Sequence, residues 1–518
     1  MDLIRKIETL YNNNTLKTYL IAFFVILLAY FNKLSHNSYP PDDYMRLFQT
    51  EDWFFQADRG RWFTSILNHF IFKESSFIQP YYNTLLSLML ISISGLFISK
   101  IWEIKNQFII GVIIVVVTIS PFWALNLFYN SNVTVSIGFL MATASLYILK
   151  DLKKYRFLGF VLLILSSGVY QTITQSLLII IIGLFLINLV NIDSIQKIKE
   201  LIYSSIKLLI LVILAYVISH FISEIIIYFN QIGKLFSPYE EATRKMGFLK
   251  ILNKIFSIIK SPNSFLHFFT LKSITATIIS ISVIIVGSYS YIKSLIIEKR
   301  AKIILFIVAL FFIFFVLHLP RFLSVLMPIR SSFHFSILLS LFFVITFLQK
   351  KIIIKNISFV LFSSLMLYNI QYISSFYDIV NRQTESSINK ANEIVNRILL
   401  NEKYNFTEKN IPNFLIVGEK NFPVASNFSK NKKKFSSRIL KGSYIPEYYT
   451  IDPFNASWSK YKIFENFTDF SFKKVDSNNK ELIQKIKNEN IINEYPNKKS
   501  IFFIDNYIVL ILDKSKLN

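Results

Sequence analysis

Eleven long apolar stretches lie between residues 17 and 373, and short polar or charged loops separate them. Stretches such as residues 80–99 and 107–124 have about the length that a helix needs to cross a hydrocarbon core of roughly 30 Å. One soluble core could not bury so many apolar helices. Inside lipid, the backbone polar groups have to be satisfied within helices. The pattern therefore predicts a polytopic α-helical membrane protein.

The charges of the loops alternate along the chain, and this alternation predicts the topology. Every second short loop carries Lys and Arg, as residues 150–156 and 299–302 illustrate. Short loops rich in Lys and Arg stay on the cytoplasmic side. The opposite loops carry Asp, Glu, Trp and Pro residues and are predicted to lie outside. We place the spans at residues 18–33, 80–99, 107–124, 133–149, 157–172, 175–191, 206–228, 271–292, 302–319, 330–348 and 356–373.

The pair of predicted spans within residues 157–191 has a second interpretation, because the polar run 170–175 separates them. As one re-entrant unit, the pair would reverse the orientation of every later segment and spoil the alternation of loop charge. As two spans, it gives an odd number of crossings. The odd number places the long C-terminal tail outside.

The predicted organisation is a transmembrane domain over residues 1–373, with outer loops at 34–79 and 229–270, and an extracytoplasmic domain over residues 374–518. The tail carries local signals of both helix and strand, including a hairpin pattern around Asp505-Asn506. We therefore expect a small α/β domain. Its predicted elements are helices at residues 391–400 and 480–487, a strand at 413–417 and two short strands within 500–512.

The composition and the motifs that are missing exclude several kinds of partner, cofactor and catalytic group. The net charge of +24 would suggest a nucleic-acid partner on a soluble chain, but much of it lies in short loops, so we expect membrane lipids and no nucleic acid. The chain has no Cys, which excludes disulfides, Cys-ligated metals and a thiol nucleophile. It also lacks a P-loop, a G-x-G-x-x-G run, a D-x-D pair and an H-E-x-x-H motif. The sequence thus shows no nucleotide-sugar site, and we expect no metal and no cofactor.

Two adjacent aspartates in the first outer loop are the main candidates for a catalytic group. Asp42 and Asp43 follow Pro40-Pro41, a pattern typical of a helix start, and Arg46 lies on the same predicted face as Asp43. In the functional interpretation one carboxylate is a general base, because neighbouring carboxylates shift each other's pKa and an arginine keeps one ionised. In the structural interpretation Asp42 caps the helix and Asp43 pairs with Arg46.

Residues 61–72 end the same loop and repeat apolar side chains at helical spacing, from Trp62 to Ile71. This spacing predicts an amphipathic helix that lies on the membrane surface. The aspartate pair would then be held on short helices above the outer leaflet.

Four later residues are candidate substrate contacts. Arg321 and Arg330 fall in the predicted outer loop after residue 319, where a guanidinium suits a donor phosphate or simply reaches the lipid headgroups. Tyr170 and Gln171 lie at the end of an apolar span. Their polar groups suit sugar hydroxyls, and they equally suit packing between helices.

The order of these motifs resembles that of the Gtr-type O-antigen glucosyltransferases, the glucosyltransferase II family. The resemblance covers nearly the whole chain, and the order of its motifs carries more weight than any single motif. Its residues are Asp42-Asp43, Arg46 and Gly60-Arg61-Trp62, then Tyr170-Gln171, then Pro320-Arg321 with Pro328 and Arg330, and finally Asp378, Ala391, Arg397 and Gly418.

The resemblance implies a GT-C type membrane glycosyltransferase, active at the outer face of a bacterial inner membrane. It would move a sugar, glucose by the family's name, from a polyprenyl-phosphate donor to a lipid-linked O-antigen of lipopolysaccharide or another surface glycan. A separate enzyme would make the donor, and a flippase would deliver it. Asp43 or Asp42 would be the base. The residues implied in substrate binding are Arg46, Arg61, Trp62, Tyr170, Gln171, Arg321 and Arg330.

Two other functions remain open at this point. A transporter or flippase of lipid-linked glycans should concentrate ionisable residues inside its spans, whereas the acidic residues here gather in outer segments. An O-antigen polymerase or ligase also works at the outer face, but its large outer loop usually lies in mid-chain. The long C-terminal tail favours the transferase.

We expect a reporter fused at Lys154 to lie in the cytoplasm and one fused at Lys432 to lie outside, because the basic loops alternate. Alkaline phosphatase and a fluorescent protein, which are active on opposite sides of the membrane, measure this directly. The same compartment for both fusions would rule out the eleven-span topology.

Overall fold

The computed structural model describes residues 14–37, 60–71, 79–192, 194–229, 274–295, 299–323, 332–349, 351–406, 410–420, 453–455, 460–475, 480–488 and 493–517. The chain forms two compact units. The first comprises Met1–Ser35, Glu51–Lys73 and Tyr81–Ser375, and the second comprises His36–Thr50, Glu74–Pro80 and Phe376–Asn518. The predicted boundary lies after residue 373.

The first unit is helical, and every predicted span overlaps a described helix. The helices are α2 (Thr15–Ala29), α3 (Phe31–Leu34), α5 (Trp62–Ile71), α6 (Pro80–Ile101), α7 (Gln107–Thr118), α8 (Pro121–Leu127), α9 (Val133–Asp151), α10 (Arg156–Ser167), α11 (Thr172–Asn191), α12 (Ile195–Phe229), α16 (Ile274–Ser294), α17 (Lys299–Leu323), α18 (His334–Phe347) and the first part of α19 (Ile352–Leu399). A short 3₁₀ helix, η3 (Asn130–Asn132), precedes α9.

Seven of the described helices are long and apolar enough to cross a membrane, and the bent pair α7–α8 adds an eighth if it is one span. Helices α2 and α18 are apolar but shorter. The chain is therefore a polytopic helical membrane protein. The count of eleven spans stays a prediction.

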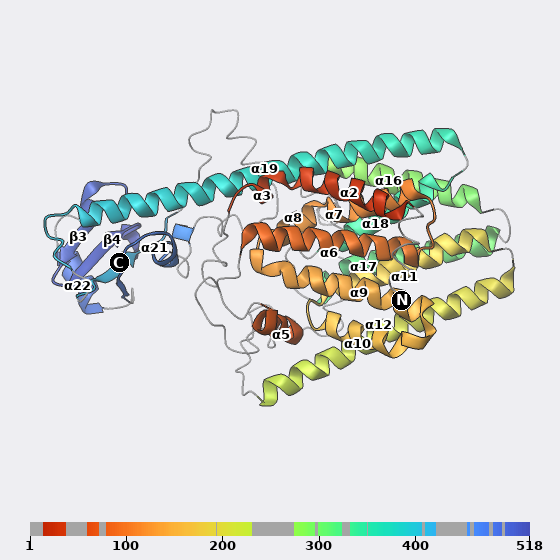
Figure 1. Ribbon diagram of the computed structural model, residues 1–518, viewed down its shortest axis with the longest axis horizontal. Coiled ribbons are helices and arrows are strands. Elements are labelled where there is room, and N and C mark those ends of the chain that lie inside the picture. Colours follow the sequence, from red (N-terminus) through yellow and green to blue (C-terminus); the bar gives the residue numbers. More distant parts are fainter. Residues whose placement is uncertain are drawn as a thin grey trace. The chain divides into compact units, whose positions relative to one another are not determined.

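Burial sorts the helices into an inner and an outer set. Every residue of α18 is buried, whereas only 17% of the most apolar 18-residue stretch of α12 is buried. Large apolar side chains such as Phe221 and Ile225 on α12 are exposed, as expected of helices that face lipid. Figure 1 shows α12 and α19 along opposite edges of the bundle, with α6, α9 and α11 between them.

The helix pair α7–α8 bends by 50° at Pro121, and side chains satisfy the backbone groups that the bend frees. The Thr118 carbonyl accepts from the Tyr30 hydroxyl at 3.1 Å, and the Ile119 carbonyl accepts from Asn369 Nδ2 at 2.9 Å. Both contacts are buried. An unpaired buried carbonyl would be unfavourable, so these two side chains stabilise the bend.

Two helices extend beyond the spans that the sequence predicted. Helix α17 continues to Leu323, so Arg321 lies in a helix and not in the expected loop after residue 319. Pro320 removes one helical hydrogen bond but leaves the φ angles of the final turn helical. Helix α19 runs unbroken over 48 residues, because the polar stretch after residue 373 contains no Pro or Gly to end it.

The second unit contains a four-stranded sheet in the order β2-β1-β4-β3. Strand β1 pairs in parallel with β2 and β4, and β3 pairs with β4 in an antiparallel hairpin. The predicted strand at residues 413–417, the hairpin around Asp505-Asn506 and the helix near residues 480–487 are confirmed. The elements are β1 (Asn413–Val417), α21 (Lys462–Phe467), β2 (Lys473–Lys474), α22 (Lys480–Asn488), β3 (Ile501–Ile504) and β4 (Tyr507–Ile511).

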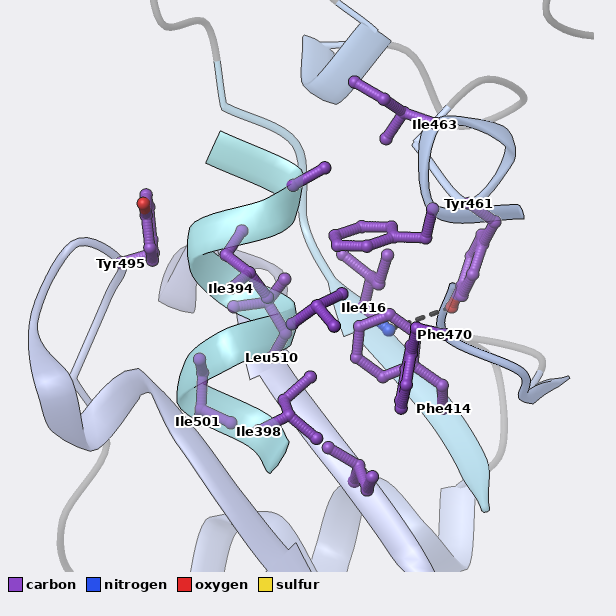
Figure 2. Close-up of a cluster of buried hydrophobic side chains, with 14 of the residues drawn as sticks. Ile394, Ile398, Phe414, Ile416, Tyr461, Ile463, Phe470, Tyr495, Ile501 and Leu510 are labelled. Carbon is purple, nitrogen blue, oxygen red and sulfur yellow. Dashed lines mark hydrogen bonds between the residues drawn. The ribbon is translucent and has the colours of Figure 1, made fainter. Parts of the chain in front are cut away.

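Both faces of this sheet are covered. Phe414 and Ile416 of β1 pack on Ile394 and Ile398 from the end of α19 (Figure 2). On the other face, Leu415, Val417 and Val509 pack on Leu482 and Ile486 of α22. The alternation along β1 thus buries both sets of side chains, which explains the continuous apolar run of the strand. The Ile416 amide also donates to the Tyr461 hydroxyl at 2.9 Å.

We expect Phe414→Ala to destabilise this sheet by about 3–5 kcal/mol, because a fully buried phenyl ring leaves a cavity. Leu400→Ala, at a side chain that is 85% exposed, is the control and should change little. Hydrogen exchange of the β1 and β4 amides in the full-length protein measures the difference. Equal protection in both variants would contradict the packing described here.

Candidate functional site

The segment Gly60-Arg61-Trp62 leads into helix α5 and docks on the turn between α10 and α11. Gly60 has φ +72°, a conformation that residues with a side chain rarely adopt. A Cβ at Gly60 would also lie 2.6 Å from Gln171 Nε2. Glycine is therefore required here for two reasons, its backbone angle and the close approach of the turn.

Two hydrogen bonds tie the start of α5 to this turn. The Phe63 amide donates to the Gly168 carbonyl at 2.9 Å, and the Thr64 hydroxyl donates to the Val169 carbonyl at 2.9 Å. The first amides of a helix and the carbonyls of a turn both lack partners within their own elements. Each element therefore supplies what the other lacks, and the Thr64 contact is buried.

Side chains complete the contact. The Arg61 guanidinium carbon lies 4.4 Å from the centroid of the Tyr170 ring, a cation–π arrangement. The Trp62 indole NH donates to Ser219 Oγ of α12 at 3.0 Å. The structure thus brings together four predicted site residues from two distant parts of the sequence. They are Arg61, Trp62, Tyr170 and Gln171.

Helix α5 has the predicted amphipathic pattern and nearly the predicted bounds, but its apolar side contacts protein. Trp62 is buried, and Phe63 and Ile66 belong to a cluster with Leu165 of α10 and Ile222 of α12. The helix was expected to lie on the membrane surface. Its contacts instead join the first loop to the bundle, which gives the loop end a fixed position.

The remaining predicted residues are not placed. Asp42, Asp43, Arg46 and Arg330 lie outside the described residues, as does all but the first residue of the predicted outer loop 229–270. The backbone of Arg321 belongs to α17, but its side chain is also outside the described set. Their roles stay predictions.

Sequence reasoning missed Ser219 and Lys33. Ser219 belongs to the buried stripe Val212, Ala215, Ser219 and Ser223 of α12, and small residues at this spacing indicate a packed helix face. Lys33 is fully buried at the end of the first span, where a lysine is usually taken to reach the headgroups. The sequence around Lys33 does not distinguish a lysine that reaches the headgroups from one that is buried between helices.

We expect Gly168→Ala to loosen α5 and destabilise the protein by about 1–3 kcal/mol, because a Cβ would lie 2.5 Å from Trp62 Nε1. Gly111→Ala is the matched control, since its Cβ would meet Thr18 Cγ2 at an ordinary 3.5 Å. The midpoint of thermal unfolding in detergent compares the two. A larger decrease in this midpoint for Gly111→Ala than for Gly168→Ala would contradict the close packing of Trp62 on Gly168.

Comparison with known families gives one match. The family described as "Glucosyl transferase GtrII" matches residues 31–347. Comparisons with curated protein sequences and with solved structures gave no match. The matched region begins at α3, includes α5 and the α10–α11 turn, and ends with α18. Because it covers more than half of the 518 residues, the chain belongs to the GtrII glucosyl transferase family.

Proposed function

We propose that this protein is a membrane glycosyltransferase that uses a polyprenyl-phosphate sugar, with glucose as the sugar. The acceptor is a lipid-linked glycan such as an O-antigen. The reaction takes place at the outer face of a bacterial inner membrane, with the C-terminal unit on the same side. Membership of the GtrII family supports the transferase class.

One observation carries the proposal. The segment Gly60-Arg61-Trp62 and the turn Tyr170-Gln171 are two of the motifs on which the resemblance rests, and they contact each other inside the matched region. Contacts between distant motifs are expected when both serve one site. In the sequence, helix α5 also ends the predicted outer loop that carries Asp42 and Asp43.

The chemistry assigns a role to each type of group. The oxygen of the acceptor hydroxyl attacks C1 of the donor sugar, and an aspartate, Asp43 or Asp42, takes the proton of that hydroxyl. The bond from C1 to the phosphate oxygen breaks, and polyprenyl phosphate leaves with the bonding electrons. Arg321 and Arg330 are proposed to stabilise the charge of this phosphate. Tyr170, Gln171 and Trp62 would contact the sugar rings, while Arg46 and Arg61 would orient the carboxylates and the substrate.

We expect Asp43→Asn to reduce the rate of sugar transfer by about 10²–10⁴-fold, the usual span for loss of a general base. Asp42→Asn should cost less, through capping or pairing with Arg46, because Asp42 directly after Pro40-Pro41 is the better N-cap. Transfer of labelled sugar in membranes, normalised to protein level, measures both.

A larger loss in Asp42→Asn than in Asp43→Asn would exchange the two roles. Full activity of both single variants and of the double variant would contradict catalysis by the first outer loop. That result would favour a transporter of lipid-linked glycans.

A further inference from the structure

A cavity of about 30 Å³ lies at the α7–α8 bend, and it is partly open rather than sealed. Residues of α7, α8, α16, α18 and α19 line it. Several of the lining residues are small: Ser120 at the bend, Ala276 and Ser280 of α16, and Ser336 of α18. Small side chains from three segments thus leave a space that larger ones would fill.

The lining offers mainly apolar surface to an occupant. The Ser336 hydroxyl already donates to the Phe333 carbonyl at 2.6 Å, and Asn369 Nδ2 donates to the Ile119 carbonyl at 2.9 Å. These two polar side chains are therefore engaged with the backbone. Most of the larger lining side chains are apolar: Val116, Phe122, Leu339 and Leu365. A hydrocarbon group suits this lining better than a charged or hydroxyl-rich one.

The size of the cavity restricts the occupant further. One group of the size of a water molecule needs about 10–15 Å³ of such volume. The cavity therefore takes about two or three groups of this size. A sugar ring or a phosphate is larger, whereas a methyl branch and the chain carbon that carries it fit.

The open side of the cavity faces the outside of the bundle. Among the lining residues, Pro121 and Tyr368 are partly exposed. The helices α16 and α19, which bound the cavity, carry exposed apolar side chains such as Ile278 and Leu367, as expected of helices that face lipid. A lipid chain in the bilayer can therefore reach the cavity without crossing the bundle.

The cavity also lies toward the end of the bundle at which α5 docks. Ala276 and Ser280 belong to the first two turns of α16, and Ser336 belongs to the first turn of α18. From the bend, the chain passes through α8 to the start of α9, crosses through α9 and returns through α10 to the turn that receives α5. The start of α9 and this turn are thus at the same end.

We propose that this cavity binds a methyl-branched segment of the isoprenoid chain of the lipid donor. The inference rests on the proposed function, since it assigns the chain of the polyprenyl-phosphate donor to a site of its own. A straight acyl chain has no side branch to enter a hollow of this size. Burial of one methyl group favours binding by about 4-fold, so the cavity selects a branched chain over a straight one.

The test compares two lipid phosphates that share a headgroup and a main-chain length. Farnesyl phosphate has methyl branches, and dodecyl phosphate has none. Both are added in equal amounts to the full-length protein in detergent, and native mass spectrometry measures the ratio of bound farnesyl phosphate to bound dodecyl phosphate. Because both lipids are present in one sample, the ratio is insensitive to the amount of folded protein.

Ser280→Leu fills the cavity, and Ser282→Leu is the matched control. Ser282 belongs to the same helix, is partly exposed and does not line the cavity. We expect Ser280→Leu to lower the ratio by about 4-fold relative to the wild type, as for the loss of one buried methyl group. Ser282→Leu should leave the ratio unchanged. The Tm of each variant shows whether it folds.

Ala276→Val keeps the test decisive if the larger side chain at residue 280 overpacks the bundle and prevents folding. It adds less volume to the same cavity from the same helix. A purely structural cavity predicts a changed Tm with an unchanged ratio. Our proposal predicts a lower ratio in the folded variant whatever the direction of the change in Tm.

A wild-type ratio in Ser280→Leu, or in Ala276→Val where Ser280→Leu does not fold, would overturn the inference. An equal decrease in Ser282→Leu would overturn the assignment to this cavity. A ratio that depends on the cavity, without any transfer of sugar from polyprenyl-phosphate glucose, would contradict the proposed function and leave this inference standing. Sugar transfer with a ratio that is the same in all variants would do the reverse.

Discussion

A backbone inside hydrocarbon has to satisfy its own polar groups, and this constraint governs where the bundle can depart from helix. Burial inside the bundle imposes the same requirement on the α7–α8 bend and on the α10–α11 turn, where carbonyls accept buried hydrogen bonds. Tyr30 and Asn369 bind the carbonyls of the bend, and Phe63 and Thr64 bind the carbonyls of the turn. Each irregular segment thus depends on a side chain or an amide from a distant part of the chain.

This dependence links the first loop to the core. Helix α5 provides the amide and hydroxyl that the turn Gly168–Gln171 needs, and Gly60 and Gly168 allow the close approach. The same contact places Arg61 on Tyr170 and Trp62 on Ser219. A requirement of backbone chemistry therefore assembles the polar end of the bundle.

The sequence predicted the local elements well. Long apolar runs predicted the helices of the first unit. The spacing of apolar residues and the residues typical of turns predicted β1, the hairpin and α22, because both signals are local in the sequence. The extension of α19 was missed, since nothing marks its membrane end except a change in polarity. The contact between residues 60–64 and 168–171 could not be predicted, because it joins segments about a hundred residues apart. The burial of Lys33 likewise depends on Asn130, far along the chain.

We propose that this member of the GtrII family transfers a sugar from a lipid phosphate. The most direct measurement uses purified protein in liposomes, with labelled polyprenyl-phosphate glucose and a lipid-linked glycan acceptor. We expect a new glycosidic bond on the acceptor with this donor and none with a nucleotide sugar. Movement of the intact lipid-linked glycan across the bilayer, with no new glycosidic bond, would contradict it.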